Sequence, residues 1–245
     1  MILSEARGRV NRWRGWIYRA RLQIRRYCSA CWVLGARFVF TFGVCDGSGY
    51  NPRVASLMAL TPEIDHFRKQ FEQLSADADA LAGPLTDLQF NWQPSPGAWS
   101  IAQCIDHLNT TARMYLPALD EGIADAIRRG LYGRGPFRYN WFNRLVAGSM
   151  EPPYRLRTKT PKAFQPPPSR PRHDVMAAFR AYQVQYVDRL RQSNGLDLTR
   201  ARVASPVLPW WRMPLGTALA FTTAHERRHL WQARRVTEAP SFPSR

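Results

Sequence analysis

The chain has 245 residues, 45% of them hydrophobic, so it can bury the core of one large domain or two small ones. Its formal net charge is +17 at pH 7, a balance that raises the question of nucleic-acid binding. No helix face that the sequence predicts combines basic residues with interleaved aromatics, so we expect no nucleic-acid partner.

Residues 1–57 differ from the rest of the chain. They carry ten arginines against only two acids, Glu5 and Asp46, and show neither helical nor strand periodicity. The apolar stretch at 31–45 is interrupted by Arg37 and is short for a membrane span, so we expect no membrane partner, with attachment through 1–57 as the alternative. We interpret 1–57 as a disordered extension or a mis-called start, with the native chain beginning at Met58. The metal-binding domain is then 58–238, and 239–245 is a tail.

The cysteines are too few for a disulfide framework, which favours a cytoplasmic location. Cys28 and Cys31 form a C-x-x-C pair, a pattern found in zinc sites and redox pairs. No second such pair accompanies it and no strand-helix context of a redox domain surrounds it. We therefore interpret the pair as coincidental.

The first predicted helix begins after Thr61, a candidate cap, with Pro62 at its first position. Apolar residues recur at steps of three and four until Gly83-Pro84, followed by a Pro- and Gly-rich loop. Ser100 and Gln103 then form a capping box for a second helix. Its apolar face continues to Leu119, and Pro117 is expected to kink it one turn before its end.

Residues 130–172 are rich in Gly, Pro and Arg, which predicts a long irregular connection that can fold over the bundle mouth. A third helix is predicted from about Asp174 to Gln192. A second connection, with Pro206 and Pro209, leads to a last helix from about Pro214 to Val236. Four long helices with an extended second link predict an all-α four-helix bundle.

The last helix contains His225 and His229, which lie four residues apart on one helix face. Two imidazoles at this spacing can share one metal ion. They could also be exposed polar positions. However, Leu219, Thr222 and their neighbours place this face toward the core, where unliganded imidazoles would be costly to bury. We therefore expect a metal ion here.

The motif also matches H-E-x-x-H of zinc proteases, in which the glutamate is the general base. The long form of that signature needs Gly and His where this chain has Gln232 and Arg235, and no histidine follows His229. A third ligand must therefore come from upstream. His66 and His173 fit surface positions, whereas His107 lies near the edge of the second helix's apolar face.

The segments 91–108 (NWQPSPGAWSIAQCIDHL) and 215–236 (LGTALAFTTAHERRHLWQARRV) resemble the DinB family of metal-binding four-helix proteins, which includes YfiT-like hydrolases. The residues 61–81 are similar to the family's first helix, so the resemblance covers 58 to about 236. It implies one divalent metal ion on His107, His225 and His229, with zinc, nickel, iron or manganese all compatible.

The resemblance further implies a metal-dependent hydrolase or a thiol (S-)transferase. A transferase would join a low-molecular-weight bacterial thiol to a small-molecule electrophile. Glu226 is a candidate base, although its position next to His225 points it partly away from the metal and a surface ion pair with Arg227 is an equally good interpretation. A non-catalytic metal- or ligand-binding stress-response protein is the alternative, and a homodimer is plausible for such a bundle.

Overall fold

The computed structural model describes residues 59–153, 160–208 and 210–244. The predictions for 1–57, including the C-x-x-C pair and the start at Met58, lie outside the described residues. Among the described residues, no helix combines the length and the apolar composition needed to cross a bilayer.

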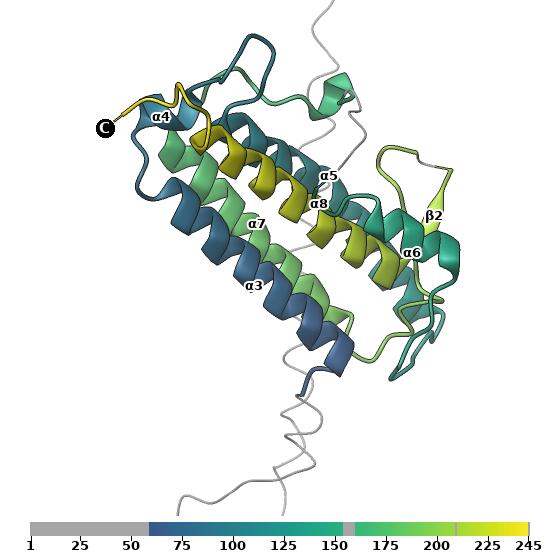
Figure 1. The fold of residues 1–245 in the computed structure, drawn as a ribbon. Coiled ribbons are helices and arrows are strands. Elements are labelled where there is room, and N and C mark those ends of the chain that lie inside the picture. The colour runs from purple at the N-terminus through teal and green to yellow at the C-terminus, as the bar shows by residue number, and fades with distance from the viewer. Residues whose placement is uncertain (1–58, 154–159, 209, 245) are drawn as a thin grey trace, which may run out of the picture. The chain divides into compact units, whose positions relative to one another are not determined.

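Four long helices form the body of the described region (Figure 1). They are α3 (Pro62–Ala82), α5 (Ile101–Arg128), α7 (Arg172–Gln192) and α8 (Leu215–Thr237). Both α3 and α5 pack against α7 and against α8. The predicted all-α four-helix bundle is thus confirmed, and the predicted helix bounds differ from the observed ones by a few residues, except at the end of α5.

The helix starts follow the capping signals in part. The Ser100 hydroxyl accepts from the backbone N–H of Gln103, whose side chain accepts from the Ser100 N–H, so the capping box of α5 is confirmed. Thr61 occupies the N-cap position and Pro62 begins α3, both as predicted, but the Thr61 side chain makes no capping hydrogen bond. Instead, the Thr61 backbone N–H donates to Asn194 Oδ1 at 2.8 Å, which ties the start of α3 to the end of α7.

The prediction that α5 ends one turn after Pro117 is wrong, because the helix continues to Arg128. Proline removes one helical hydrogen bond, yet Leu119, Ile123 and Ala126 beyond it are buried in the core. Burial of these apolar side chains offsets the loss of that bond.

Two apolar clusters make up the core, and the three histidines of the predicted metal site lie at the level between them. One cluster contains Phe71 stacked on Tyr186 at 4.7 Å and includes α8 residues up to Leu219. The other includes α8 residues from Leu230 onward. The α8 segment between these two residues carries buried polar side chains instead, among them Glu226 and His229.

Short elements that the sequence did not predict lie between the long helices. They are α4 (Asp87–Asn91), α6 (Trp141–Gly148), the 3-10 turn η2 (Lys162–Phe164) and the antiparallel strands β1 (Arg202–Ala204) and β2 (Arg212–Pro214). The connection at 130–172 is therefore not wholly irregular. None of the residues of α6 is buried, so this helix lacked the periodic core face by which a helix is predicted.

Candidate metal centre

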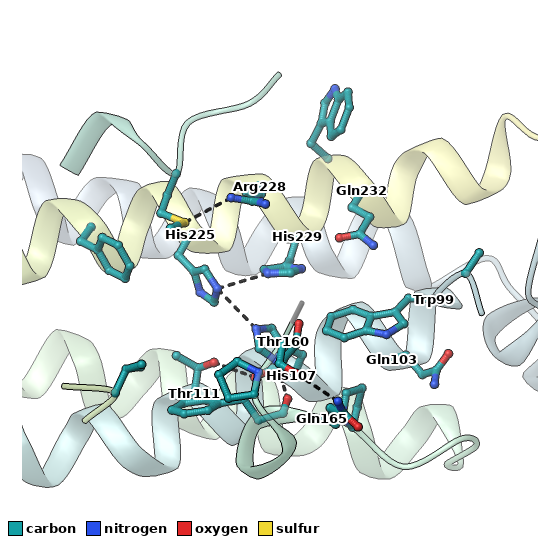
Figure 2. Close-up of a pocket in the computed structure, with 18 of the residues that line it drawn as sticks. Trp99, Gln103, His107, Thr111, Thr160, Gln165, His225, Arg228, His229 and Gln232 are labelled. Atoms are coloured by element: carbon teal, nitrogen blue, oxygen red, sulfur yellow. Dashed lines mark hydrogen bonds between the residues drawn. The ribbon is translucent and has the colours of Figure 1, made fainter. Parts of the chain in front are cut away.

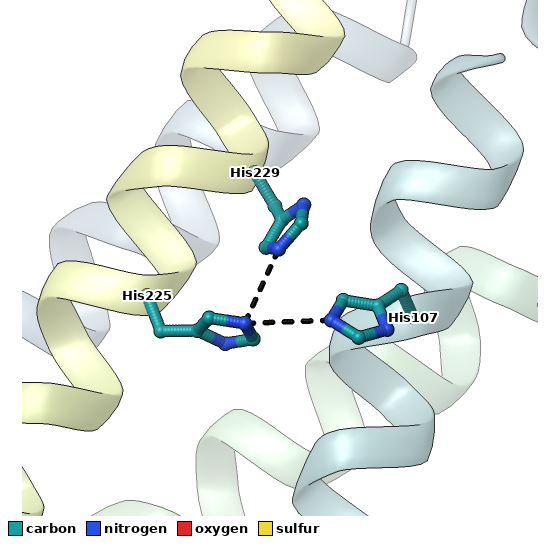
Figure 3. Close-up of side chains that lie close together, drawn as sticks. All are labelled: His107, His225 and His229. Atoms are coloured by element: carbon teal, nitrogen blue, oxygen red, sulfur yellow. Dashed lines mark hydrogen bonds between the residues drawn. The ribbon is translucent and has the colours of Figure 1, made fainter. Parts of the chain in front are cut away.

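Three histidines from two helices lie close together at the level between the two apolar clusters of the core. His107 lies in the first half of α5, within a run from Ile101 to Asn109 in which every residue is buried. His225 and His229 lie one turn apart on α8, which packs against α5. His107 and His229 are buried and His225 is half-buried, so the inward orientation expected from the sequence is observed. Figure 3 shows the three rings turned toward a common point.

The distances between the rings suit a shared cation. The Nε2 atom of His225 lies 3.4 Å from that of His107 and 3.2 Å from that of His229. Candidate ligand atoms of the three residues all lie within 4.8 Å of one another. Two nitrogens bound to one zinc ion at about 2.0–2.1 Å and a tetrahedral angle would lie about 3.3–3.4 Å apart. The side chains therefore fit one ion with little adjustment.

The proton on His107 can be assigned from its other nitrogen. His107 Nδ1 lies 2.7 Å from the backbone carbonyl oxygen of Phe164, which can only accept, so Nδ1–H donates. The neutral ring then has an unprotonated Nε2 facing the other two imidazoles. The Nε2 atom of His225 has close contacts with Nε2 of His107 and with Nε2 of His229. Both contacts could be hydrogen bonds only if one N–H of His225 were shared by two acceptors. A cation between the three nitrogens satisfies all of them better.

The imidazoles are held neutral, which is the form that binds metal. Burial lowers the pKa of His225 to about 3, and the charge that His107 would carry if protonated and the charge of Arg228 act in the same direction. Burial also lowers the pKa of His229 well below its usual value, and the amide of Gln232 opposes this only in part. For His107, burial lowers the pKa, although the bond to the Phe164 carbonyl opposes the shift.

The three rings open onto a cavity of about 1220 Å³ (Figure 2). Trp99 stacks on His229 with 5.7 Å between ring centroids, and Phe221 stacks on His225 at 6.1 Å. The link between α5 and α7 also contributes to the wall, through residues that include Thr160 and Phe164. This agrees with the expectation that the long connection folds over the bundle mouth.

The other candidate residues lie elsewhere. Glu226 is buried on the side of α8 that faces α7, where its carboxylate accepts from Gln183 Nε2 at 2.9 Å, and it does not line the cavity. Burial raises its pKa to about 8. The alternative pairing with Arg227 is not observed, because that guanidinium pairs with Glu151. His66 and His173 are exposed, as expected.

Sequence reasoning missed two features of this site. The hydrogen-bond partner of His107 is a backbone carbonyl in the link, which no side-chain pattern signals. Arg228 lines the cavity and lowers the pKa of all three histidines through its charge. Its spacing, three residues after His225 and one before His229, was the available signal.

Comparison with known proteins identifies the family of the chain. A family model described as the DinB superfamily matches residues 70–233. Among solved structures, the chain is similar to YfiT from Bacillus subtilis, described as a probable metal-dependent hydrolase with an unusual four-helix bundle topology. The identity is 15%, the match covers 76% of this chain and 92% of that one, and the TM-score is 0.40. No curated protein matches the chain. Because the family model spans more than half of its residues, this protein belongs to the DinB superfamily.

Proposed function

We propose that the protein binds one divalent transition-metal ion through His107, His225 and His229 and acts on a small molecule as a hydrolase or a thiol transferase. The observation that carries this proposal is the convergence of three imidazole Nε2 atoms at the wall of a large cavity. Structural zinc sites are usually closed by four protein ligands, whereas three ligands leave a position for water or substrate.

The donor set is compatible with several ions. Neutral imidazoles suit zinc, nickel, copper and iron, and only the number and type of ligands restrict the choice here. The hydrogen bond from His107 Nδ1 to the Phe164 carbonyl is the type of outer contact that orients a metal-binding ring. Trp99 and Phe221 pack on the other two rings and limit their rotation.

When bound, the ion would supply a Lewis acid that lowers the pKa of a coordinated water or holds a thiol as its thiolate. The chain's own residues would orient the reactants against the walls of the cavity, which include the aromatic side chains of Trp99 and Phe221. Glu226 does not take part in this proposal as a base, because its carboxylate bonds to Gln183 away from the cavity.

Elemental analysis of the full chain tests the metal site. We expect about one transition-metal ion per chain in the wild type and at least tenfold less in His107→Ala and in His229→Ala, in line with the affinity lost when metal sites are disturbed. His66→Ala and His173→Ala are matched controls, since both remove an exposed histidine and should keep the metal. Equal metal content in all five proteins would overturn the proposal.

An activity screen of the metal-loaded protein separates the two reactions. Ester and amide hydrolysis without added thiol would identify a hydrolase, whereas consumption of an electrophile only with a small thiol would identify a transferase. In either case turnover should disappear in His229→Ala and persist in His173→Ala. Metal binding without turnover in the whole screen would instead support the non-catalytic stress-response alternative.

A further inference from the structure

The short helix α6 carries its large apolar side chains on the outside. Trp141 is 75% exposed and Leu145 is 60% exposed, and both lie on one face because they are four residues apart. Phe142, next to Trp141, is 46% exposed. The half-buried positions of the helix hold smaller side chains, namely Asn143, Val146 and Ala147. This order is the reverse of that in a helix whose apolar face packs on the core.

The loop between β1 and β2 adds further exposed apolar side chains. Trp210 is 80% exposed, and Val207 and Leu208 are exposed as well. The ring of Trp211 lies 6.4 Å from that of Phe142, so this loop and α6 lie side by side, as Figure 1 also shows. We define the apolar patch as the exposed apolar residues of α6 and of this loop: Trp141, Phe142, Leu145, Val207, Leu208 and Trp210.

The apolar patch is too concentrated to be ordinary surface scatter. Its members are six of the ten large hydrophobic residues that are exposed in the described part of the chain. Single exposed apolar residues are normal on a protein surface, whereas a contiguous group marks a surface that interacts with a partner.

The segments that carry the apolar patch are basic. Residues 134–148 and 202–214 contain five arginines and neither aspartate nor glutamate. All five are exposed, and within the described residues none of them forms an ion pair: Arg134, Arg138, Arg144, Arg202 and Arg212. Glu151, the first acid after α6, is paired with Arg227. A partner that covers the apolar patch should therefore supply negative charge.

A second copy of the chain fits this charge poorly. In a two-fold dimer the same surface meets itself, so Arg144 and Arg212 would face further arginines with no acid in the patch segments to compensate them. The apolar stretch at 31–45 is also a poor occupant, because the segment 1–57 carries ten arginines against two acids. An anionic phospholipid surface offers negative headgroups to arginine and an apolar boundary to tryptophan and leucine.

We infer that the apolar patch and its flanking arginines dock on the surface of an anionic phospholipid membrane. The tryptophans lie at the level of the headgroups and no part of the patch crosses the bilayer. Local sequence patterns do not signal this surface, because α6 and the β1–β2 loop lie far apart in the chain and meet only in the folded protein. The inference departs from the expectation of no membrane partner, which rested on the stretch at 31–45 alone.

This inference goes beyond the proposed function and does not depend on a bound metal. Val207 and Leu208 line the cavity as well as belonging to the apolar patch, so docking brings the rim of the cavity to the lipid surface.

Cosedimentation of the full chain with lipid vesicles tests the inference. One set of vesicles is made of phosphatidylcholine alone, and the other of equal parts of phosphatidylcholine and the anionic phosphatidylglycerol. We expect the wild type to bind the anionic vesicles about tenfold or more tightly than the neutral ones, because arginines near an anionic surface add to the binding. Absence of binding to the anionic vesicles, or equal binding to both, would overturn the inference.

The apolar contribution is measured with a double variant, Trp141→Ala with Leu145→Ala. It should weaken binding to the anionic vesicles by about tenfold or more, because two large apolar side chains no longer enter the interface. The matched control is Leu88→Ala with Val184→Ala, since these residues are 72% and 61% exposed but lie on α4 and α7. Equal binding by the two double variants would refute docking through the patch and assign it to another part of the chain.

The contribution of charge is measured with Arg144→Gln combined with Arg212→Gln. This variant should also bind the anionic vesicles about tenfold or more weakly, with little change on the neutral ones. Arg113→Gln combined with Arg234→Gln removes the same charge at exposed positions outside the patch segments. If both variants lose the same affinity, attraction follows net charge alone and the patch is not the docking surface.

Sedimentation velocity without vesicles tests the second copy as the occupant. We expect the same molecular mass for the wild type and for Trp141→Ala with Leu145→Ala. A wild-type dimer that dissociates in this variant would show that a second copy covers the apolar patch, and would overturn the inference.

Discussion

Replacing Gly216 with alanine should disrupt the start of α8. A Cβ built at this position would lie 1.8 Å from the hydroxyl oxygen of Tyr139 and 2.6 Å from its Cζ, well below the 3.0 Å limit of real Cβ contacts. The Tyr139 hydroxyl donates to Glu63 Oε1 at 2.7 Å, so the ring cannot move without breaking that bond. Alanine at Gly216 therefore displaces a half-buried ring that connects the link to α3.

The expected loss of unfolding free energy in Gly216→Ala is the sum of three contributions. Loss of a hydrogen bond to a charged group costs about 1.5–3 kcal/mol, and overpacking adds about 1–3 kcal/mol. The better helix propensity of alanine returns about 1 kcal/mol. We therefore expect Gly216→Ala to lower the free energy of unfolding by roughly 2–5 kcal/mol.

Equilibrium unfolding in urea, followed by far-ultraviolet circular dichroism, measures this change. Gly148→Ala in α6 is the matched control, because a Cβ there meets nothing within 4 Å and the helix preference alone should stabilise slightly. In a Tyr139→Ala background the Gly216 substitution should cost little, because the clashing ring is gone. A wild-type midpoint for Gly216→Ala would refute the packing argument.

Four further predictions follow from the same contacts. Gly122→Ala should destabilise by about 1–3 kcal/mol in urea, because its Cβ would lie 2.7 Å from the backbone oxygen of Arg202, which cannot turn aside; a neutral effect would contradict the packing of β1 on α5. Cys104 is fully buried and burial raises its thiol pKa, so peptide mapping should find it alkylated only in denaturant; rapid native labelling would show that this part of α5 opens. Saturating zinc should raise the unfolding free energy by about 2.7 kcal/mol at a hundredfold excess over Kd, and His173→Ala but not His107→Ala should keep this gain. In the metal-free protein, burial lowers the pKa of His225 from 6.5 to about 3, and those of His107 and His229 are also lowered, so the unfolded state binds more protons below pH 6.5. Stability is thus full above that pH and falls as the pH drops through it, and a urea midpoint that is flat from pH 7.5 to pH 5 would contradict these shifts.

Local sequence signals were sufficient where neighbouring residues determine the structure. The capping box at Ser100 and Gln103 and the apolar spacing of α3, α7 and α8 depend on contacts within a few residues, so the four helices were predictable from the sequence. The spacing of His225 and His229 identified two of the three candidate ligands, because a helix places residues four apart on one face.

The remaining features depend on contacts between residues that are far apart in the sequence, which local patterns do not predict. Pro117 breaks a local rule, and only the burial of the residues that follow it explains why α5 continues to Arg128. Thr61 occupies the N-cap position of α3 without a capping bond from its side chain, and its backbone N–H donates to Asn194, which is far away in the sequence. The strands β1 and β2 are three residues each, too short to give an alternating pattern, and they pair across a loop.

The candidate site, too, was predictable only in part, and the rest depends on how the helices pack. The sequence, through its family resemblance, supplied His107, His225 and His229, but only the packing of α5 on α8 brings their Nε2 atoms together. Glu226 matched a protease signature, yet the rotation of α8 turns it toward Gln183 and leaves Arg228 at the cavity. Helix periodicity determines which residues share a face, whereas the partner that each face meets depends on how the whole bundle packs.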